Sequence, residues 1–426
     1  MKYISTNNKS PSIPYEEAIF AGLAPDGGLY VPESIPQFSH DELQSLVKMS
    51  LHDIATLVLN KWFHDELSKE ELRDIVTNAL SFPIPFVEVG NHRVLELFHG
   101  PTLSFKDFTA RIVTPLMAKC LKSKGKKLRL LLSSAGDTGS AVAHSCSNLD
   151  NSEVVVVIPK YGESVMKREQ IVRVGGNVTV VEVDGNFDTC RDFVSKSFSD
   201  PSLHKVGLIP ANSISIIHLI PQIIYFVYVY SLLYPKLATV LITSTDFANA
   251  YVALMAKYMG IPFEQIVLTC DSDHPAYKYF TSGEYTEVKY DKKSKGSRNP
   301  GNFERVLSIC NHSHVKFCHD INIIEICESK VPVMINALYH EHGYITDFNT
   351  ARSWLAGDTI DSNTKNIVII GKVSPLKYAD EIQKKTGIKV DNHAILAELL
   401  KHKSSKVIPM TNKYEDFRNF LDKKFS

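Results

Sequence analysis

The chain has 426 residues, enough for two or three domains, and 44% of them are hydrophobic, enough to fill a large core. Lysine plus arginine and aspartate plus glutamate both number 47, so no bulk charge attracts nucleic acid or an anionic membrane. The seven cysteines contain no Cys-x-x-Cys pair, and MKYISTNNKS at the amino terminus has no apolar signal-peptide core. We therefore expect a folded protein of the reducing cytoplasm.

Residues 40–80 read as helical, and the chain then changes to short strands that alternate with helices. Each expected strand is rich in valine, isoleucine and leucine, which is typical of strands buried on both faces of a parallel sheet. The runs lie at residues 126–135, 153–160, 177–184, 238–245, 265–271 and 366–372. The pattern predicts an α/β fold, in which ligands bind where strand ends meet helix starts.

Lys106 lies between two phenylalanines in LELFHGPTLSFKDFTARIV, residues 95–113. An ammonium group among Leu103, Phe105 and Phe108 would lose its water, which lowers its pKa and makes the free amine available as a nucleophile or base. The alternative is a lysine that extends to solvent or pairs with a neighbouring carboxylate. This segment alone leaves both interpretations open.

Two strand-to-helix junctions have the composition of binding loops. In SSAGDTGSAVAHS, residues 133–145, small residues allow close backbone approach and the helix start supplies free N–H donors, so we expect an anion there. In TSTDFANAYVALMAKYMG, residues 243–260, polar residues precede an apolar helix. Either junction is also compatible with a helix cap that binds no ligand.

The segment ISIIHLIPQIIYFVYVYSLLY, residues 214–234, is apolar and long enough to cross a bilayer. His218, Pro221 and Gln222 interrupt its start, and the surrounding α/β pattern favours a helix in the core or in a subunit interface over a membrane span.

Residues 311–320, NHSHVKFCHD, contain three histidines and one cysteine, which are metal-ligand types. They lack a second, separately spaced ligand pair. We therefore expect no metal site.

Several segments in the same order resemble the threonine synthase family. FHGPTLSFKDF resembles the segment that carries the family's lysine bound to pyridoxal 5′-phosphate (PLP), and AGDTGSAVAHS resembles its S-G-D-T-G loop. Residues 22–36, GLAPDGGLYVPESIP, are similar to the family's opening segment, and residues 211–226, ANSISIIHLIPQIIYF, to its N-S-I-x-x-x-R-x-x-P-Q helix. GNFERVL at residues 301–307 and TDFNTA at residues 346–351 continue the match. The combination covers nearly the whole chain and is specific, although each element alone is weak.

The resemblance implies a fold type II PLP enzyme with an amino-terminal helical cap, residues 1–84, and a catalytic core of two α/β subdomains, residues 85–426. It implies a cytoplasmic lyase of threonine biosynthesis that converts O-phosphohomoserine and water into threonine and phosphate. The expected partner is a small, phosphorylated amino acid, with neither nucleic acid nor membrane involved. Family members occur as monomers and homodimers.

Site residues follow from the resemblance position by position. Lys106 would hold PLP and move protons at the substrate's α and β carbons. The other implied cofactor-binding residues are Ser244, Thr245, Asp246, Phe247, Ala248, Asn249 and Lys372. The implied substrate-binding residues are Ser134, Ala135, Gly136, Asp137, Thr138, Asn212 and His218.

The chain differs from the family where phosphate groups are bound. Thr245 and Ala248 replace both glycines of the family's S-G-N-F-G-D loop, and Asp246 stands where an amide is expected. Lys372 replaces a neutral hydroxyl, so it either changes electron withdrawal by the PLP ring or reaches a phosphate. His218 replaces an arginine, which loses a permanent charge.

Three functional interpretations therefore stand. The first is a threonine synthase with local substitutions. The second is a PLP lyase of the same family that acts on another amino acid. The third is a non-catalytic descendant that keeps the fold but no longer binds PLP.

Overall fold

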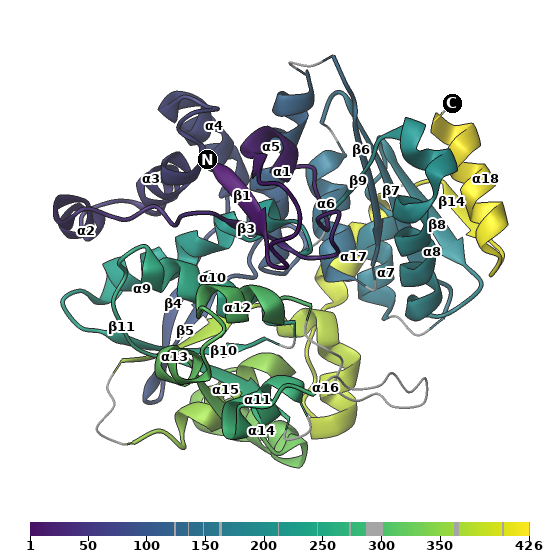
Figure 1. The fold of residues 1–426 in the computed structure, drawn as a ribbon. Helices are drawn as coiled ribbons and strands as arrows, with labels where there is room; N and C mark the ends of the chain where they lie inside the picture. Colours follow the sequence, from purple (N-terminus) through teal and green to yellow (C-terminus); the bar gives the residue numbers. More distant parts are fainter. Residues whose placement is uncertain are drawn as a thin grey trace.

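The computed structural model describes residues 1–122, 125–134, 136–147, 149–161, 164–211, 213–244, 246–271, 274–286, 301–361, 366–402 and 404–425. Two α/β units, each built on one sheet, lie beside an amino-terminal unit (Figure 1). The expected α/β fold class is confirmed. The six strands expected from sequence all form, and they divide between two sheets.

The larger sheet has six strands in the order β12-β11-β10-β13-β5-β4, and every neighbouring pair is parallel except β4 and β5. Its strands are β4 (Phe86–Val89), β5 (His92–Glu96), β10 (Ala238–Thr243), β11 (Phe263–Cys270), β12 (Asn322–Glu325) and β13 (Ile367–Gly371). The central strands β10 and β13 are buried along their whole length, as their apolar sequences predict.

Helices of this unit fill the lower half of Figure 1. They are α10 (Ala248–Tyr258), α11 (Pro275–Ser282), α12 (Phe303–Ile309), α13 (His314–Asp320), η4 (Glu328–Lys330), α14 (Val331–His342), α15 (Phe348–Gly357), η5 (Pro375–Tyr378) and α16 (Ala379–Thr386), where η marks a 3₁₀ helix. Helix α15 packs its Trp354 and Ala351 into one apolar core with Ile369 of β13.

The smaller sheet is parallel throughout, with the order β14-β8-β7-β6-β9. Its strands are β6 (Leu128–Ser133), β7 (Ser152–Pro159), β8 (Val178–Val183), β9 (Leu208–Pro210) and β14 (Val407–Met410). Its helices are α5 (Lys106–Lys122), α6 (Asp137–Cys146), α7 (Val165–Val172), α8 (Phe187–Ser199), η1 (Pro201–Val206), α17 (His393–Lys401) and α18 (Tyr414–Phe425). The carboxyl-terminal β14 and α18 thus return to the unit that begins with α5, 301 residues before β14 (Figure 1).

The amino-terminal unit combines helices with a three-stranded antiparallel sheet of order β2-β1-β3. Its elements are β1 (Lys2–Ser5), β2 (Ile13–Pro14), α1 (Tyr15–Ala18), β3 (Tyr30–Pro32), α2 (His40–Leu46), α3 (Leu51–Phe63) and α4 (Lys69–Ala79). Capping boxes of Ser39 with Glu42 and of Ser68 with Glu71 define where α2 and α4 begin. The sequence predicted only the helices, because strands this short show no readable period. The boundary at residue 84 stays a prediction.

The apolar segment at residues 214–234 forms two short 3₁₀ turns, η2 (Ile216–His218) and η3 (Ile220–Gln222), followed by α9 (Ile223–Leu233). Pro221 has no N–H group, which is consistent with a regular helix that begins only after it. By length and composition Ile216–Leu233 is a candidate membrane span, but 83% of it is buried inside the protein. The segment therefore forms part of the hydrophobic core, as the sequence favours.

Candidate active site

Lys106 is the first residue of α5, and the turn before it is fixed by Asp107. The Asp107 carboxylate accepts the Thr102 N–H at 2.9 Å and the Thr102 hydroxyl at 2.8 Å. A β carbon on Gly100 would lie 2.5 Å from Oδ2 of Asp107, so glycine lets the chain pass this carboxylate. Burial raises the pKa of Asp107 to about 6, although the Thr102 bonds oppose the shift. The turn thus presents Lys106 at a fixed place.

The Lys106 turn is fastened to the loop that follows β13. The Phe105 N–H donates to the Lys372 carbonyl oxygen at 2.7 Å, and the Ser374 N–H donates to the Leu103 carbonyl oxygen at 3.1 Å. Both lysine side chains approach one aromatic ring, because Nζ of Lys106 lies 4.7 Å and Nζ of Lys372 lies 5.4 Å from the centre of the Phe105 ring. The two predicted lysines therefore belong to one site.

Lys106 borders a cavity between α5, α6 and the segment before α9. The cavity is lined by Lys106, Thr109, Ala110, Thr138, Ala141, Val142, Ala211, Ser213, His218 and Gln222. Of the residues expected from sequence, the fold therefore brings Lys106, Thr138 and His218 to one cavity.

Two buried polar atoms on this cavity have no hydrogen-bond partner among the described residues. They are Nε2 of His218 and Oγ1 of Thr109. Burial, with the nearby charge of Lys106 acting in the same direction, lowers the pKa of His218 to about 3, so the imidazole is neutral at pH 7. The neutral His218 imidazole and the Thr109 hydroxyl can each form one hydrogen bond with a ligand.

The loop between β6 and α6 is held by Ser134, whose hydroxyl oxygen accepts the N–H groups of Gly136 at 3.0 Å and Gly139 at 2.8 Å. Gly136 has a φ of 148°, and a β carbon there would lie 2.8 Å from the Lys167 side chain. Because the first N–H groups of a helix have no acceptor within it, the start of α6 favours an anion beside Thr138. Ser134 therefore stabilises the conformation of the loop.

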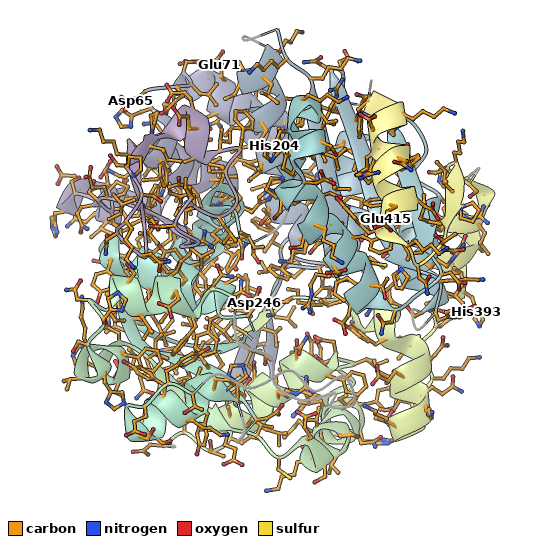
Figure 2. All side chains as sticks on the ribbon, turned by 45° about the vertical axis from the view of Figure 1, so that its right-hand side comes forward. Asp65, Glu71, His204, Asp246, His393 and Glu415 are labelled. Atoms are coloured by element: carbon orange, nitrogen blue, oxygen red, sulfur yellow. The ribbon has the colours of Figure 1, made fainter. Side chains whose placement is uncertain are left out.

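The β10–α10 junction carries most of the predicted cofactor residues, and Figure 2 labels Asp246 near the middle of the molecule. Oδ1 of Asp246 accepts the Ala248 N–H at 3.2 Å, so the carboxylate lies at the start of α10. Phe247 adopts a left-handed conformation with a φ of 60°. The Ser244 hydroxyl is buried, with no hydrogen-bond partner in the described part of the chain.

Lys372 follows β13 and extends to the same junction. Its Nζ donates to the Thr243 carbonyl oxygen and, at 3.2 Å, to Oδ1 of Asn249. Burial lowers the pKa of Lys372 to about 8, while the carboxylate of Asp246 acts in the opposite direction. The predicted residues Lys372, Asn249 and Asp246 thus lie together at the start of α10.

Three expected site residues, Ala135, Asn212 and Thr245, lie outside the described residues. In residues 311–320, which contain histidine and cysteine, Sγ of Cys318 lies 3.2 Å from Nε2 of His314. No group of three or more His, Cys, Asp or Glu side chains suited to a metal occurs in the described ranges.

Sequence reasoning missed Lys377 and Arg305. Nζ of Lys377 lies 2.7 Å from Oδ1 of Asp137 and donates to the Thr102 carbonyl oxygen at 2.9 Å, which links the α6 loop to the Lys106 turn. Arg305 is fully buried and donates to the carbonyl oxygens of Tyr30 and other residues. Arg305 lies within the quoted GNFERVL, but nothing local shows that either side chain is buried.

Comparison with known proteins places the chain in a family. Over 320 residues it is 30% identical to the threonine synthase of Pseudomonas aeruginosa, an alignment that covers 72% of this chain and 68% of that protein. This chain belongs to the threonine synthase family. Residues 2–80 match the family model described as the threonine synthase N terminus, and residues 94–214 match the one described as pyridoxal-phosphate dependent enzyme.

Other threonine synthases are similar along the whole chain. That of Buchnera aphidicola from Schizaphis graminum is 27% identical over 432 residues, with 99% of each chain covered. The PLP-bound threonine synthase structure from Brucella melitensis has a TM-score of 0.92 at 25% identity and covers 100% of this chain and 99% of its own. The Escherichia coli structure has a TM-score of 0.86 at 26% identity, with 100% of both chains covered. The resemblance and the fold type expected from the sequence are thereby confirmed.

Proposed function

We propose that this chain is a threonine synthase that uses PLP to convert O-phosphohomoserine and water into threonine and phosphate. The observation that carries the proposal is the cavity on which Lys106, Thr138 and His218 meet, in a chain that belongs to the threonine synthase family. The relatives found do not favour the two alternatives, a lyase for another amino acid and a non-catalytic descendant.

The residues present fit PLP. Lys106 offers an amine on the cavity, and the Ser244 hydroxyl and Nε2 of His218 are buried without partners among the described residues, as expected where a polar ligand belongs. Lys106 would hold the cofactor covalently, and Ser244, Asn249 and Lys372 would hold it at the start of α10. When bound there, PLP supplies an electron sink for the substrate's carbon atoms.

Lys106 is the proposed proton carrier. Its amine would take and return protons at the α and β carbons of the substrate. The Phe105 ring lies 4.7 Å from Nζ and helps to hold the amine in place. Asp107 only fixes the shape of the turn before Lys106, because both its carboxylate oxygens accept hydrogen bonds from Thr102.

The start of α6 is the proposed site of the substrate's carboxylate, with Thr138 on the cavity and the first N–H groups of the helix beside it. The charges of Lys377, Lys167 and Lys106 all act on Asp137, the acidic residue of this loop. These three cations offer positive charge near the start of α6, which supports a substrate that carries anionic groups.

The chain acts on a small-molecule amino acid, as its relatives do. We further propose that it works in the cytoplasm, as a monomer or homodimer, without nucleic acid or membrane as a partner. The equal numbers of basic and acidic residues, 47 each, support the absence of nucleic acid and membrane partners.

Phosphate release from O-phosphohomoserine, measured in the presence of PLP, tests the proposal. We expect Lys106→Ala to release phosphate about a thousandfold more slowly than the wild type, because the proton carrier is gone. Lys401→Ala removes an exposed lysine of α17 and should leave the rate unchanged. A wild-type rate no higher than that of Lys106→Ala would show that the proposed reaction is wrong.

A further inference from the structure

The start of α10 holds an unusual pair of charges. Helix α10 has 11 residues, and the amino-terminal end of a helix of this length favours an anion. The anion now present is part of the chain, because Oδ1 of Asp246 accepts the Ala248 N–H at 3.2 Å. In the same first turn, Nζ of Lys372 donates to Oδ1 of Asn249 at 3.2 Å. A carboxylate and an ammonium group therefore share one helix start.

A second observation points to a ligand at this place. The Ser244 side chain, between β10 and Asp246, is 2% exposed, and its hydroxyl has no hydrogen-bond partner among the described residues. Buried hydroxyl groups are normally paired, by protein or by a bound molecule. A ligand oxygen at the start of α10 would give Ser244 its partner.

The charges that act on Lys372 come from several elements. Asp246 precedes α10, Lys106 begins α5, Asp347 precedes α15 and Asp137 begins α6. The carboxylate of Asp347 is already engaged by the Thr350 hydroxyl and the Asn349 N–H, and that of Asp137 by Lys377. Asp246 is therefore the acidic neighbour of Lys372 that lies on the α10 start itself.

We propose that Asp246 and Lys372 together set how strongly this chain holds the phosphate group of PLP. Asp246 competes with that phosphate for the N–H groups of α10, and Lys372 supplies the positive charge that offsets the competition. The inference rests on the proposed function, since it takes PLP as the ligand. It assigns opposite effects to two side chains that both lie at the first turn of α10.

The physical reason is electrostatic. A carboxylate next to a bound phosphate is repelled by it, and the buried residues Ala248 and Asn249 at the start of α10 strengthen this repulsion. The ammonium group of Lys372 attracts both anions and is held in place by two acceptor oxygens, on Thr243 and Asn249. Neutralising Asp246 should thus favour phosphate, and neutralising Lys372 should disfavour it.

The test compares two ligands that differ by the phosphate alone, PLP and pyridoxal. Dissociation constants of both ligands are measured by absorption titration. The ratio of the pyridoxal dissociation constant to the PLP dissociation constant gives the contribution of the phosphate group to binding. We expect Asp246→Asn to raise this ratio about tenfold and Lys372→Gln to lower it about tenfold. Asp200→Asn is a matched control. Like Asp246, Asp200 accepts the N–H group of the residue two positions later, at 2.9 Å, but it does so at the start of η1 and not at the start of α10. Its ratio should equal that of the wild type.

The outcomes separate the two proposals. Folding of each variant is checked by its thermal unfolding, and Asp246→Ser and Lys372→Met replace any variant that does not fold. If the wild type binds PLP and the ratio is unchanged in either folded variant, the role of the pair is overturned while the proposed function stands. If the wild type binds neither ligand and gives no Lys106-dependent absorption band, the proposed function fails, and this inference fails with it.

Discussion

Nζ of Lys377 lies 2.7 Å from Oδ1 of Asp137, although the Lys377 side chain has no exposed surface. The pair joins η5 to the start of α6, two elements that lie 240 positions apart in the chain. The buried ammonium group also donates to the Thr102 carbonyl oxygen at 2.9 Å, so the turn before Lys106 and the expected carboxylate-binding loop are fixed to one another.

Replacing Lys377 should destabilise the protein. Lys377→Met leaves the Asp137 carboxylate without its nearest cation, and we expect the free energy of unfolding in urea to fall by about 3 kcal/mol at pH 7. Lys401→Met breaks an exposed ion pair with Glu398 and should cost less than about 0.5 kcal/mol. Equal effects of the two substitutions would contradict the role given to Lys377.

Asp107 should make stability depend on pH between about 4 and 6. Its pKa is about 6 in the folded chain against an ordinary value of 3.8, so the folded state binds more protons in this window. Stability contributed by this group therefore falls as pH rises, by about 3 kcal/mol at most. Unfolding free energies of the wild type and Asp107→Asn, measured at both ends of the window, give the difference. Identical pH slopes in the two proteins would rule out the raised pKa.

Lys372 should make phosphate binding depend on pH. Its pKa of about 8 means that it loses its charge as pH rises through 8, with Asp246, Lys106, Asp347 and Asp137 as the charged neighbours. The preference for PLP over pyridoxal should therefore weaken above pH 8. The ratio of the two dissociation constants at pH 7 and pH 9 measures this, and Lys372→Gln should show no such change. A ratio that stays constant in the wild type would speak against a titrating Lys372.

His218 should favour function at the expense of stability. His218→Leu removes a buried ring nitrogen that has no partner among the described residues, so we expect about 1 kcal/mol of added stability at pH 7. Phosphate release should fall about tenfold, because the cavity loses a hydrogen-bonding group. The gain in stability should grow below pH 6.5, since the lowered pKa of His218 costs the wild type stability there. An unchanged rate of phosphate release in His218→Leu would show that His218 is not part of the active site.

The sequence by itself determined six of the strands and the turn that carries Lys106. Runs of valine, isoleucine and leucine predict strands such as β7 and β10, because burial on both faces requires apolar residues at every position. The Lys106 turn is also local, since Gly100, Thr102 and Asp107 that shape it lie within six residues of the lysine. The substitutions at residues 244–249 and at Lys372 were visible as departures from the family.

Only the tertiary structure decided which of these residues meet. The division of the strands between two sheets, and the return of β14 beside β8, depend on packing between segments far apart in the chain. The pairing of Lys377 with Asp137 and of Lys372 with Asn249 likewise joins segments that are far apart in the chain. A charged side chain looks the same in a sequence whether it is solvated or buried, and burial is what makes its partners and its pKa matter.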